Sequence, residues 1–385
     1  MDYNAGVMKI VIAPDSFKGS VSAQGACAAM ARGVGRVVPD AQIVSIPMAD
    51  GGEGTVDALV SSTDGEIRVA KVRGPLGEEV SARYGLLPGG AAVIEMAASS
   101  GLPLVSPEYR NPLLASTYGL GQLILEAVDA GCRKLLIGIG GSATNDCGCG
   151  MAQALGVRFL DGQGQPLAAA LAGGTIGDIK SVDMDGLSAS VRGCEVLVAC
   201  DVRNPLLGPD GATHVYGPQK GADEAMLQQL ETNMEGVIEV IETAVGQSVR
   251  DVPGAGAAGG LGAGLMAFLG AKLERGVEIV MRQCRFAEQI AGADVLITGE
   301  GRIDATTAAG KTLSGVAGVA RDQSIPVVAL AGSLGQGAEL VYDIGIDAVV
   351  PICSGPMTLP EAMQNAEALL ADAAERALRL MRIIS

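Results

Sequence analysis

Five short apolar runs in this chain end at glycine-rich turns that carry a carboxylate. The segments are APDSFKG, ADGGEGT, GIGGSATND, ACDVRNP and ITGEGRID. In an open parallel α/β sheet, ligands bind outside the carboxyl ends of the strands, where side chains and loop amides converge. An ionised carboxylate away from water is costly unless it is paired, hydrogen-bonded or bound to a metal, so acids at strand ends indicate a catalytic site. The acids that support this interpretation are Asp15, Asp50, Asp146, Asp201, Glu300 and Asp304.

Each of these acids has a second interpretation as a helix cap, because Asp is common between a strand and a helix. This alternative applies most directly to GIGGSATNDCGCG, which lies between an apolar run and the helical pattern MAQALG. The glycines and backbone amides of the same loop are also typical of an anion cradle at a helix amino terminus. The candidate ligand contacts in the loop are Gly140, Gly141, Ser142, Asn145 and Asp146.

Basic residues stand inside several of the glycine turns. Lys18 follows Asp15 and Ser16 after the first apolar run, and a lysine held there can meet a phosphate or a carboxylate as a point charge. The stretch TGEGRIDATTAAGKT adds Arg302 and Lys311. Its AGKT tail does not complete a P-loop, because the earlier glycine that the P-loop pattern requires is an alanine here.

Three further loops are candidate ligand sites. The loops DVRNPLLGPDG and YGPQKGAD place Asn204 and Lys220 beside prolines and glycines. Rigid polar loops of this kind suit substrate positioning, with ordinary turn chemistry as the alternative. Residues 254–259 match GxGxxG literally, but they follow the charged segment SVRDVP instead of a buried strand. The dinucleotide-binding pattern is therefore weak.

Composition and charge argue against several classes of protein. The 27 basic and 43 acidic residues give a net charge of −16, whereas nucleic acids and anionic membranes attract basic patches. The eight cysteines form no CxxC pair and there is one histidine, so we expect no zinc cluster. Scattered thiols fit a reducing cytosol, and the amino-terminal apolar run is too short for a signal peptide, so we expect a cytoplasmic location. Seven glycines in residues 254–271 favour a loop and a short buried helix over a membrane span.

Strand-like runs alternate with helical patterns along most of the chain, which predicts an α/β fold with mostly parallel strands. The runs are KIVIA, IVSIP, AVIEMA, KLLIGIG, EVLVAC, DVLITG, VVALAG and DAVVPI. Helices are predicted from Ser20 or Ser22 to Arg32, over residues 111–130, and from Thr358 to Met381.

Between residues 68 and 90 the pattern changes to charged, alternating runs, which predicts a hairpin and entry into another domain. We therefore expect two domains. Residues 1–70 with 285–385 form a discontinuous Rossmann-like domain with a parallel sheet, and residues 71–284 form an inserted second α/β domain.

Seven blocks together resemble the signature segments of the type I glycerate kinase family, from about Met8 to the last helix. They are APDSFKGS, ADGGEGT, GIGGSATND, DVRNPLLG, YGPQKGA, PGAGAAGGLG and GEGRID with GK. The resemblance implies transfer of the terminal phosphate of ATP, with Mg²⁺, to D-glycerate, generally giving 2-phosphoglycerate. It also implies an active cleft between the two domains. The departures are Thr306, where the family usually has glutamine, and Cys147 and Cys149, where smaller residues are more usual.

Phosphoryl transfer needs a metal, cations on the moving charge and an acceptor hydroxyl held in line. Under the resemblance, Asp201 is the base or orienting group for the glycerate hydroxyl, with Asp304 as its rival. The catalytic candidates are Asp201, Asp304, Lys18 and Arg302. The substrate- or phosphate-binding candidates are Asp15, Ser16, Gly140, Gly141, Ser142, Asn145, Asp146, Asn204, Lys220 and Lys311. The metal-side candidates are Asp50, Glu53 and Glu300.

Two other functions stay open at this point. One is an NAD-dependent hydroxy-acid dehydrogenase that uses residues 254–259, and the other is a non-catalytic sensor of sugar acids. The kinase interpretation predicts ATP and D-glycerate as small-molecule partners in organic-acid catabolism, with no nucleic acid and no membrane. The oligomeric state, including a homodimer, is left open.

Overall fold

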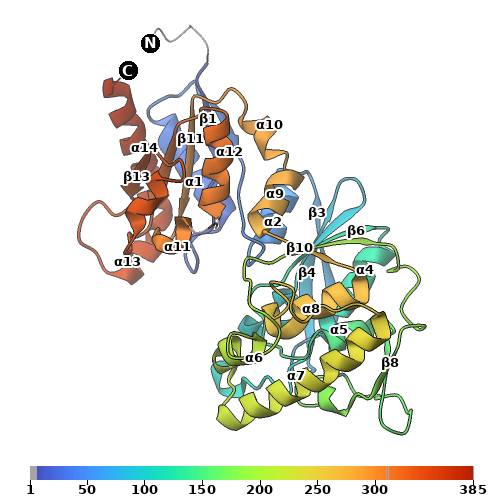
Figure 1. Ribbon diagram of the computed structural model, residues 1–385. Coiled ribbons are helices and arrows are strands. Elements are labelled where there is room, and N and C mark those ends of the chain that lie inside the picture. Colours follow the sequence, from blue (N-terminus) through green and yellow to red (C-terminus); the bar gives the residue numbers. More distant parts are fainter. Residues whose placement is uncertain (1–6, 309, 311, 385) are drawn as a thin grey trace. The chain divides into compact units, whose positions relative to one another are not determined.

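The computed structural model describes residues 7–308, 310 and 312–384 (Figure 1). The chain forms two compact units. The terminal unit contains Met1–Asp50, Asp57–Thr63 and Val280–Ser385, and the central unit contains Gly51–Val56 and Asp64–Ile279. Each unit has its own sheet and its own buried apolar cluster. The expected α/β class, with a discontinuous domain and an inserted second domain, is confirmed.

The terminal unit is built on a five-stranded parallel sheet in the order β13–β12–β11–β1–β2. Its strands are β1 (Lys9–Ile12), β2 (Gln42–Ser45), β11 (Val295–Glu300), β12 (Val327–Ala331) and β13 (Ala348–Pro351). Each strand coincides with one of the apolar runs that predicted it. The chain passes from β1 to β2 on one side and from β11 to β13 on the other, so the strand order reverses between β1 and β11. In doubly wound sheets, ligands bind at this reversal.

The helices of the terminal unit begin at the residues that the capping signals predict. Ser22 caps α1 by accepting a hydrogen bond from the Gly25 amide. Thr358 and Glu361 form a reciprocal capping box at the start of α13. The helices are α1 (Ala23–Gly35), α10 (Phe286–Ile290), α11 (Ala305–Ala308), α12 (Thr312–Asp322), α13 (Leu359–Gln364) and α14 (Ala366–Ile384), with a 3₁₀ turn at Ala338–Tyr342. The chain crosses between the units at four places, and two of these boundaries fall within α2 (Thr55–Ser62) and α9 (Gly276–Gln283).

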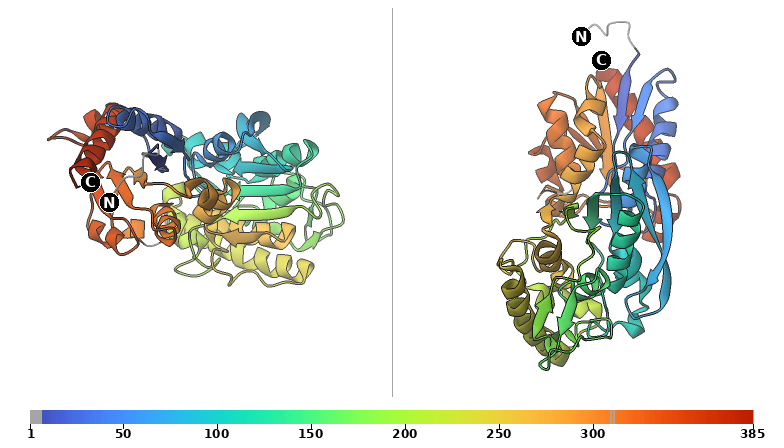
Figure 2. Two further views of the ribbon diagram at one scale, coloured as in Figure 1. Left: turned by 90° about the horizontal axis from the view of Figure 1, so that it is seen from above. Right: turned by 90° about the vertical axis from the view of Figure 1, so that its right-hand side faces the viewer.

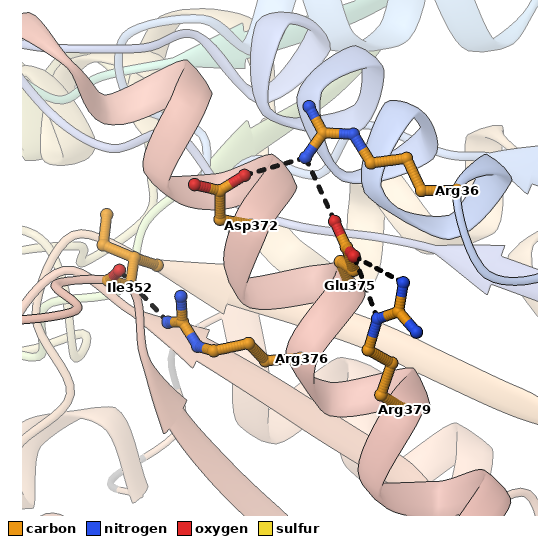
Figure 3. Close-up of polar contacts among 6 residues, drawn as sticks. All are labelled: Arg36, Ile352, Asp372, Glu375, Arg376 and Arg379. Atoms are coloured by element: carbon orange, nitrogen blue, oxygen red, sulfur yellow. Dashed lines mark hydrogen bonds and ion pairs between the residues drawn. The ribbon is translucent and has the colours of Figure 1, made fainter.

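Helices α1 and α14, from opposite ends of the chain, pack side by side on the sheet (Figure 2). A Cβ atom at Gly33 would lie 2.0 Å from the carbonyl oxygen of Ala371, so only glycine permits this approach. At the surface, Arg36 pairs with Asp372 at 2.8 Å and with Glu375 at 3.2 Å (Figure 3). Exposed ion pairs of this kind add little stability, so the buried apolar contacts hold the two helices together.

The central unit has a six-stranded mixed sheet in the order β10–β9–β6–β5–β4–β3. Its strands are β3 (Glu66–Arg73), β4 (Glu79–Leu87), β5 (Ala91–Glu95), β6 (Lys134–Gly138), β9 (Glu195–Ala199) and β10 (Lys272–Glu274). Strands β3 and β4 form the expected antiparallel hairpin, whereas β5, β6, β9 and β10 run parallel. A separate two-stranded sheet pairs β7 (Arg158–Leu160) with β8 (Ser181–Asp183).

The helices of the central unit cover this sheet and carry its polar loops. They are α3 (Ala97–Ser100), α4 (Tyr118–Asp129), α5 (Cys149–Ala154), α6 (Ala212–Tyr216), α7 (Glu224–Val245) and α8 (Ala257–Leu269). Short 3₁₀ turns lie at Leu102–Leu104, Pro107–Tyr109, Ile176–Asp178 and Pro218–Lys220. Within the described residues, no helix is long and apolar enough to cross a membrane.

The glycine run at 254–264 packs backbone against backbone. A Cβ atom at Gly259, whose φ is +70°, would lie 2.0 Å from the Thr144 carbonyl oxygen. A Cβ atom at Gly264 would lie 2.4 Å from the Cys147 carbonyl oxygen. No strand directly precedes this run, so the context that a dinucleotide fingerprint requires is missing. Instead, the run packs against the loop that follows β6, at Thr144 and Cys147.

Two helix predictions were wrong in extent. The helix expected over 111–130 begins only at Tyr118, because the preceding residues form turns in which Asn111 accepts from the Leu113 amide. Thr117, just before the helix, donates from both its amide and its hydroxyl to Asp146. The helix expected from Thr358 to Met381 is two helices, since α13 ends at Gln364 and α14 begins at Ala366.

Candidate active site

Three neighbouring strands of the terminal unit end in carboxylates. Asp15 follows β1, Asp50 follows β2, and Glu300 is the last residue of β11. Because β11, β1 and β2 are adjacent and parallel, their carboxyl ends meet at one edge of the sheet. This edge includes the reversal of strand order, which is the position expected for a ligand site in such a sheet.

Lys18 lies among these three carboxylates. Its ammonium nitrogen is 3.6 Å from Oδ2 of Asp50, and its side chain is 70% exposed. The charge of Asp50 raises the pKa of Lys18 most strongly, and Asp15 and Glu300 raise it further. The edge therefore holds a permanent cation that solvent, and so a ligand, can reach.

Asp15 is the buried member of the cluster, at 7% exposure. Its Oδ1 accepts a hydrogen bond from the Ser16 amide, and its Oδ2 accepts one from the Thr312 hydroxyl, both at 2.6 Å. Burial raises the pKa of Asp15, the Thr312 hydrogen bond opposes that rise, and the charge of Asp50 adds to it. Ser16, a candidate ligand residue in the sequence, thus uses its backbone amide to hold the Asp15 carboxylate.

The segment after β11 folds into a hydrogen-bonded loop. Glu300 accepts from the Thr307 hydroxyl at 2.5 Å. Asp304 accepts at Oδ1 from the amide and hydroxyl of Thr306, and at Oδ2 from Nε of Arg302 at 3.1 Å. The hydroxyl bond from Thr306 is the largest of the effects that lower the pKa of Asp304. Thr306 therefore holds Asp304 in place.

Lys311, the remaining basic candidate of this segment, lies outside the described residues.

A second row of polar groups lies at the carboxyl ends of the central strands. Asp201 follows β9, is exposed, and accepts at Oδ1 from the Gly276 amide at 3.0 Å. Asn204, in the same loop, accepts from the Tyr216 hydroxyl at 2.7 Å and donates to the Asp210 carbonyl at 2.8 Å. Both of its amide atoms are engaged within the unit, so Asn204 holds the shape of the loop that carries Asp201.

The loop that follows β6 divides into an exposed and a buried part. Gly140 and Gly141 are exposed, whereas residues 142–150 are buried. Asp146, at 0% exposure, accepts from Thr117 and from the amides of Gly148 and Gly150. Burial raises its pKa, and these hydrogen bonds oppose the rise. Asp146 therefore fixes the loop from inside.

Lys220 contacts the same loop, and Asn145 belongs to its buried part. The ammonium of Lys220 donates to the Thr144 carbonyl at 2.6 Å, and burial lowers the pKa of Lys220 to about 7 against an opposing effect of Asp146. Asn145 donates to the Thr213 hydroxyl at 3.3 Å, and its Oδ1 is buried without a hydrogen-bond partner. Ser142 shares a 3.0 Å hydrogen bond with the Thr144 hydroxyl.

Within the central unit, the part of the ADGGEGT segment that begins at Gly51 lies against the end of β6. A Cβ atom at Gly138 would lie 2.1 Å from the Gly51 carbonyl oxygen, so glycine permits the crossing. Glu53 is exposed in this segment, and Glu95, the last residue of β5, accepts from the Val56 amide at 2.8 Å. Glu95 is a strand-end carboxylate that the sequence reasoning missed, although its position in AVIEMA offered the same signal as the others.

The two thiols of the loop are not nucleophiles. Cys147 and Cys149 are fully buried, and burial raises the pKa of both. A buried thiol with a raised pKa stays protonated and unreactive.

The described residues include no group of three or more His, Cys, Asp or Glu side chains arranged to hold a metal ion by themselves. Asp50 and Glu300 belong to the terminal unit, whereas Glu53 belongs to the central unit. Mg²⁺ is commonly held by one or two carboxylates together with substrate phosphates, so it does not need such a group. The oxygen-only carboxylates around Lys18 fit Mg²⁺ that arrives with a phosphate ligand.

Comparison with known proteins identifies the relatives of this arrangement. The model of the glycerate kinase family matches residues 10–382. The chain belongs to the glycerate kinase family. The family resemblance expected from the seven sequence blocks is thereby confirmed.

Members of the glycerate kinase family resemble this chain over nearly their whole length. A glycerate kinase from Halalkalibacterium halodurans is 52% identical over 98% of both chains. The glycerate 2-kinase of Escherichia coli K12 is 49% identical over 93% of this chain and 94% of its own. The crystal structure of a protein assigned as glycerate kinase 2 from Salmonella typhimurium LT2 has a TM-score of 0.87 and 44% identity, and the match covers 98% of this chain and 99% of that one.

Proposed function

We propose that this member of the glycerate kinase family transfers the terminal phosphoryl group of ATP to D-glycerate and produces 2-phosphoglycerate. The observation that carries the proposal is the group of Asp15, Asp50 and Glu300 around Lys18, at the reversal of strand order in a parallel sheet. The names of the relatives, including a glycerate 2-kinase, support the substrate and the position of the phosphate.

Phosphoryl transfer depends mainly on positioning and on neutralising charge. Bound with ATP, Mg²⁺ would neutralise phosphate oxygens, and Asp50 and Glu300 are the carboxylates proposed to hold it, with Glu53 as a further candidate. Lys18 is exposed and keeps its positive charge, so it suits contact with phosphate oxygens. We propose the same role for Arg302 and Lys311, with the glycerate carboxylate as the other anion that they could meet.

The acceptor hydroxyl of glycerate must be oriented and must lose its proton. The hydroxyl oxygen forms the new bond to the terminal phosphorus, the bond to the bridging oxygen breaks, and ADP leaves. We assign the orienting and proton-accepting role to Asp201, which is exposed at a strand end. Asp304 suits this role less, because donors occupy both of its oxygens and its pKa is lowered.

The loop after β6 contributes in two ways in this account. Gly140 and Gly141 are exposed and are proposed to meet the anion directly. Asn145, Asp146 and Lys220 are buried and are proposed to hold the loop in shape without touching the substrate. Ser142 and Asn204 are engaged within the central unit and support the positions of their neighbours.

The other functions have less support. A dehydrogenase would need residues 254–259 for a dinucleotide, but Gly256 and Gly259 are used in close packing against the backbone of Pro205 and Thr144. A sugar-acid sensor would not need the strand-end carboxylates. The active cleft between the two domains, the cytoplasmic location, the catabolic role and the oligomeric state stay predictions.

A steady-state assay that couples ADP release to NADH oxidation tests the proposal. We expect turnover that requires D-glycerate, ATP and Mg²⁺ together, and that is much slower with L-glycerate. Turnover with no dependence on glycerate, or none with any combination, would contradict the proposed function.

A further inference from the structure

The hydrogen bond between Thr312 and Asp15 joins two segments far apart in the chain. Thr312 is the first residue of α12 and is fully buried, and Asp15 follows β1. The threonine Oγ1 lies 2.6 Å from Oδ2 of Asp15. The Ser16 amide donates to the other oxygen at the same distance. The carboxylate is therefore held at both oxygens, and among the contacts of the described residues the one from Thr312 comes from outside its own loop.

This contact matters because Asp15 is in an unfavourable place for a negative charge. Burial raises the pKa of Asp15 and the charge of Asp50 raises it further, whereas the Thr312 hydrogen bond lowers it. A hydrogen bond to an ionised, buried carboxylate is about twice as strong as one between neutral groups. Thr312 thus helps to keep Asp15 charged and in one orientation.

The charge of the cluster indicates which ligand depends on that orientation. Among the described residues, the carboxylates of Asp15, Asp50 and Glu300 surround the ammonium group of Lys18, so these four groups together are negative. A negative cluster draws a divalent cation, whereas a bare phosphate or a glycerate carboxylate would be repelled by it. We therefore expect Asp15 to affect binding of the metal-nucleotide complex and not binding of glycerate.

The AGKT segment uses its threonine differently from a P-loop. In a P-loop, the hydroxyl of this threonine coordinates Mg²⁺. Here the hydroxyl proton is donated to Asp15, so the carboxylate is the group presented to the site.

We propose that Thr312 is a positioning residue that orients Asp15 for binding of the metal-nucleotide complex. The inference rests on the proposed function for the identity of the nucleotide. Groups that orient metal-site carboxylates typically change metal affinity about 10- to 100-fold when they are removed.

The test compares T312V, which keeps the shape but loses the hydroxyl, with T312S, which keeps the hydroxyl. T298V is the matched control, because Thr298 is also fully buried but donates its hydroxyl to the Ala13 carbonyl at 2.7 Å. Mn²⁺ binding in the presence of a non-hydrolysable ATP analogue is measured by electron paramagnetic resonance, without glycerate. The KM values for Mg·ATP and for D-glycerate are measured separately.

For T312V we expect Mn²⁺ binding and the KM for Mg·ATP to weaken by about 10-fold or more. The KM for D-glycerate should stay within about twofold, and T312S should restore both quantities. The inference is overturned if T312V binds Mn²⁺ as T298V does, or if the two KM values change equally. If T312V does not fold, T312A is judged by the same criteria.

A different set of results would show that the proposed function is wrong while the role of Thr312 is correct. If wild type transfers no phosphate to D-glycerate but Mn²⁺ binding still weakens in T312V, the role of Thr312 stands and the substrate assignment fails.

Discussion

The ammonium nitrogen of Lys220 lies 2.6 Å from the carbonyl oxygen of Thr144, a residue of the loop that follows β6, and both residues are buried. Burial lowers the pKa of Lys220 from 10.5 to about 7. In the sequence, Lys220 stands in the glycine-rich segment YGPQKGAD and is a candidate phosphate ligand. In the structure it binds a backbone carbonyl instead. The stability of the protein should therefore depend on whether Lys220 is protonated.

Lys220 should make stability depend on pH in a defined direction. Between pH 7 and pH 10.5 the unfolded chain binds a proton at this lysine that the folded chain has lost, so stability rises with pH in that window. Below pH 7 both states carry the charge and the cost of burying it is fully present. The urea midpoint of wild type, minus that of K220M, should therefore increase from pH 7 to pH 9.5. A constant difference would mean that Lys220 stays charged in the fold.

The glycine at position 259 should be irreplaceable for a steric reason. A Cβ atom there would lie 2.0 Å from the Thr144 carbonyl oxygen, on a backbone with φ of +70°. We expect G259A to lower stability by more than about 1 kcal/mol and to reduce turnover by displacing the loop after β6. The melting temperature and the coupled kinase assay measure the two effects.

Gly236 provides the matched control for that substitution. It lies within α7, and a Cβ atom there would meet nothing within 4 Å. G236A should raise stability by about 0.5–1 kcal/mol, because alanine is the better helix former. If G259A is as stable as G236A, the close packing described for the loop is incorrect.

Removal of the Asp201 carboxylate should affect catalysis much more than folding. Asp201 is exposed and accepts one hydrogen bond from the Gly276 amide. We expect D201N to reduce kcat about 10²- to 10⁴-fold, the usual range for a lost acid or base group, with an unchanged circular dichroism spectrum. The control is D210N, an exposed acid in the same loop. Equal kcat values for D201N and D210N would contradict the role of Asp201 as the proton acceptor and would favour Asp304 for that role.

Loss of the Lys18 charge should weaken binding of the nucleotide and slow transfer. K18M leaves the three surrounding carboxylates without their cation, and we expect kcat/KM for Mg·ATP to fall about 10²-fold or more. K71M is the control, because Lys71 on β3 forms an exposed pair with Glu79 on β4. A K18M enzyme that matches K71M in kcat/KM would remove Lys18 from the phosphate site.

All five strands of the terminal sheet, and β5, β6 and β9 of the central sheet, could be predicted from sequence because each is a short apolar run, whereas the short strand β10 was not predicted. The hairpin at β3 and β4 and the cap at Ser22 carry equally local signals. These features depend on neighbours within a few residues, so a single sequence contains the information.

The direction of the polar side chains could not be predicted in the same way. Asp146 is turned inward by Thr117, 29 residues away, and Lys220 by the Thr144 carbonyl, 76 residues away. Thr312 meets Asp15 across 297 residues. A strand-end position shows that a residue is near the site, but its partners decide whether it faces the ligand or supports the loop.

Phosphorus NMR of the purified protein with ATP, Mg²⁺ and D-glycerate tests the central claim most directly, because one spectrum reports both transfer and the carbon that receives the phosphate. We predict that the ATP resonances are replaced by those of ADP and of 2-phosphoglycerate. A 3-phosphoglycerate resonance would contradict the assigned position, and unchanged ATP would contradict the kinase activity itself.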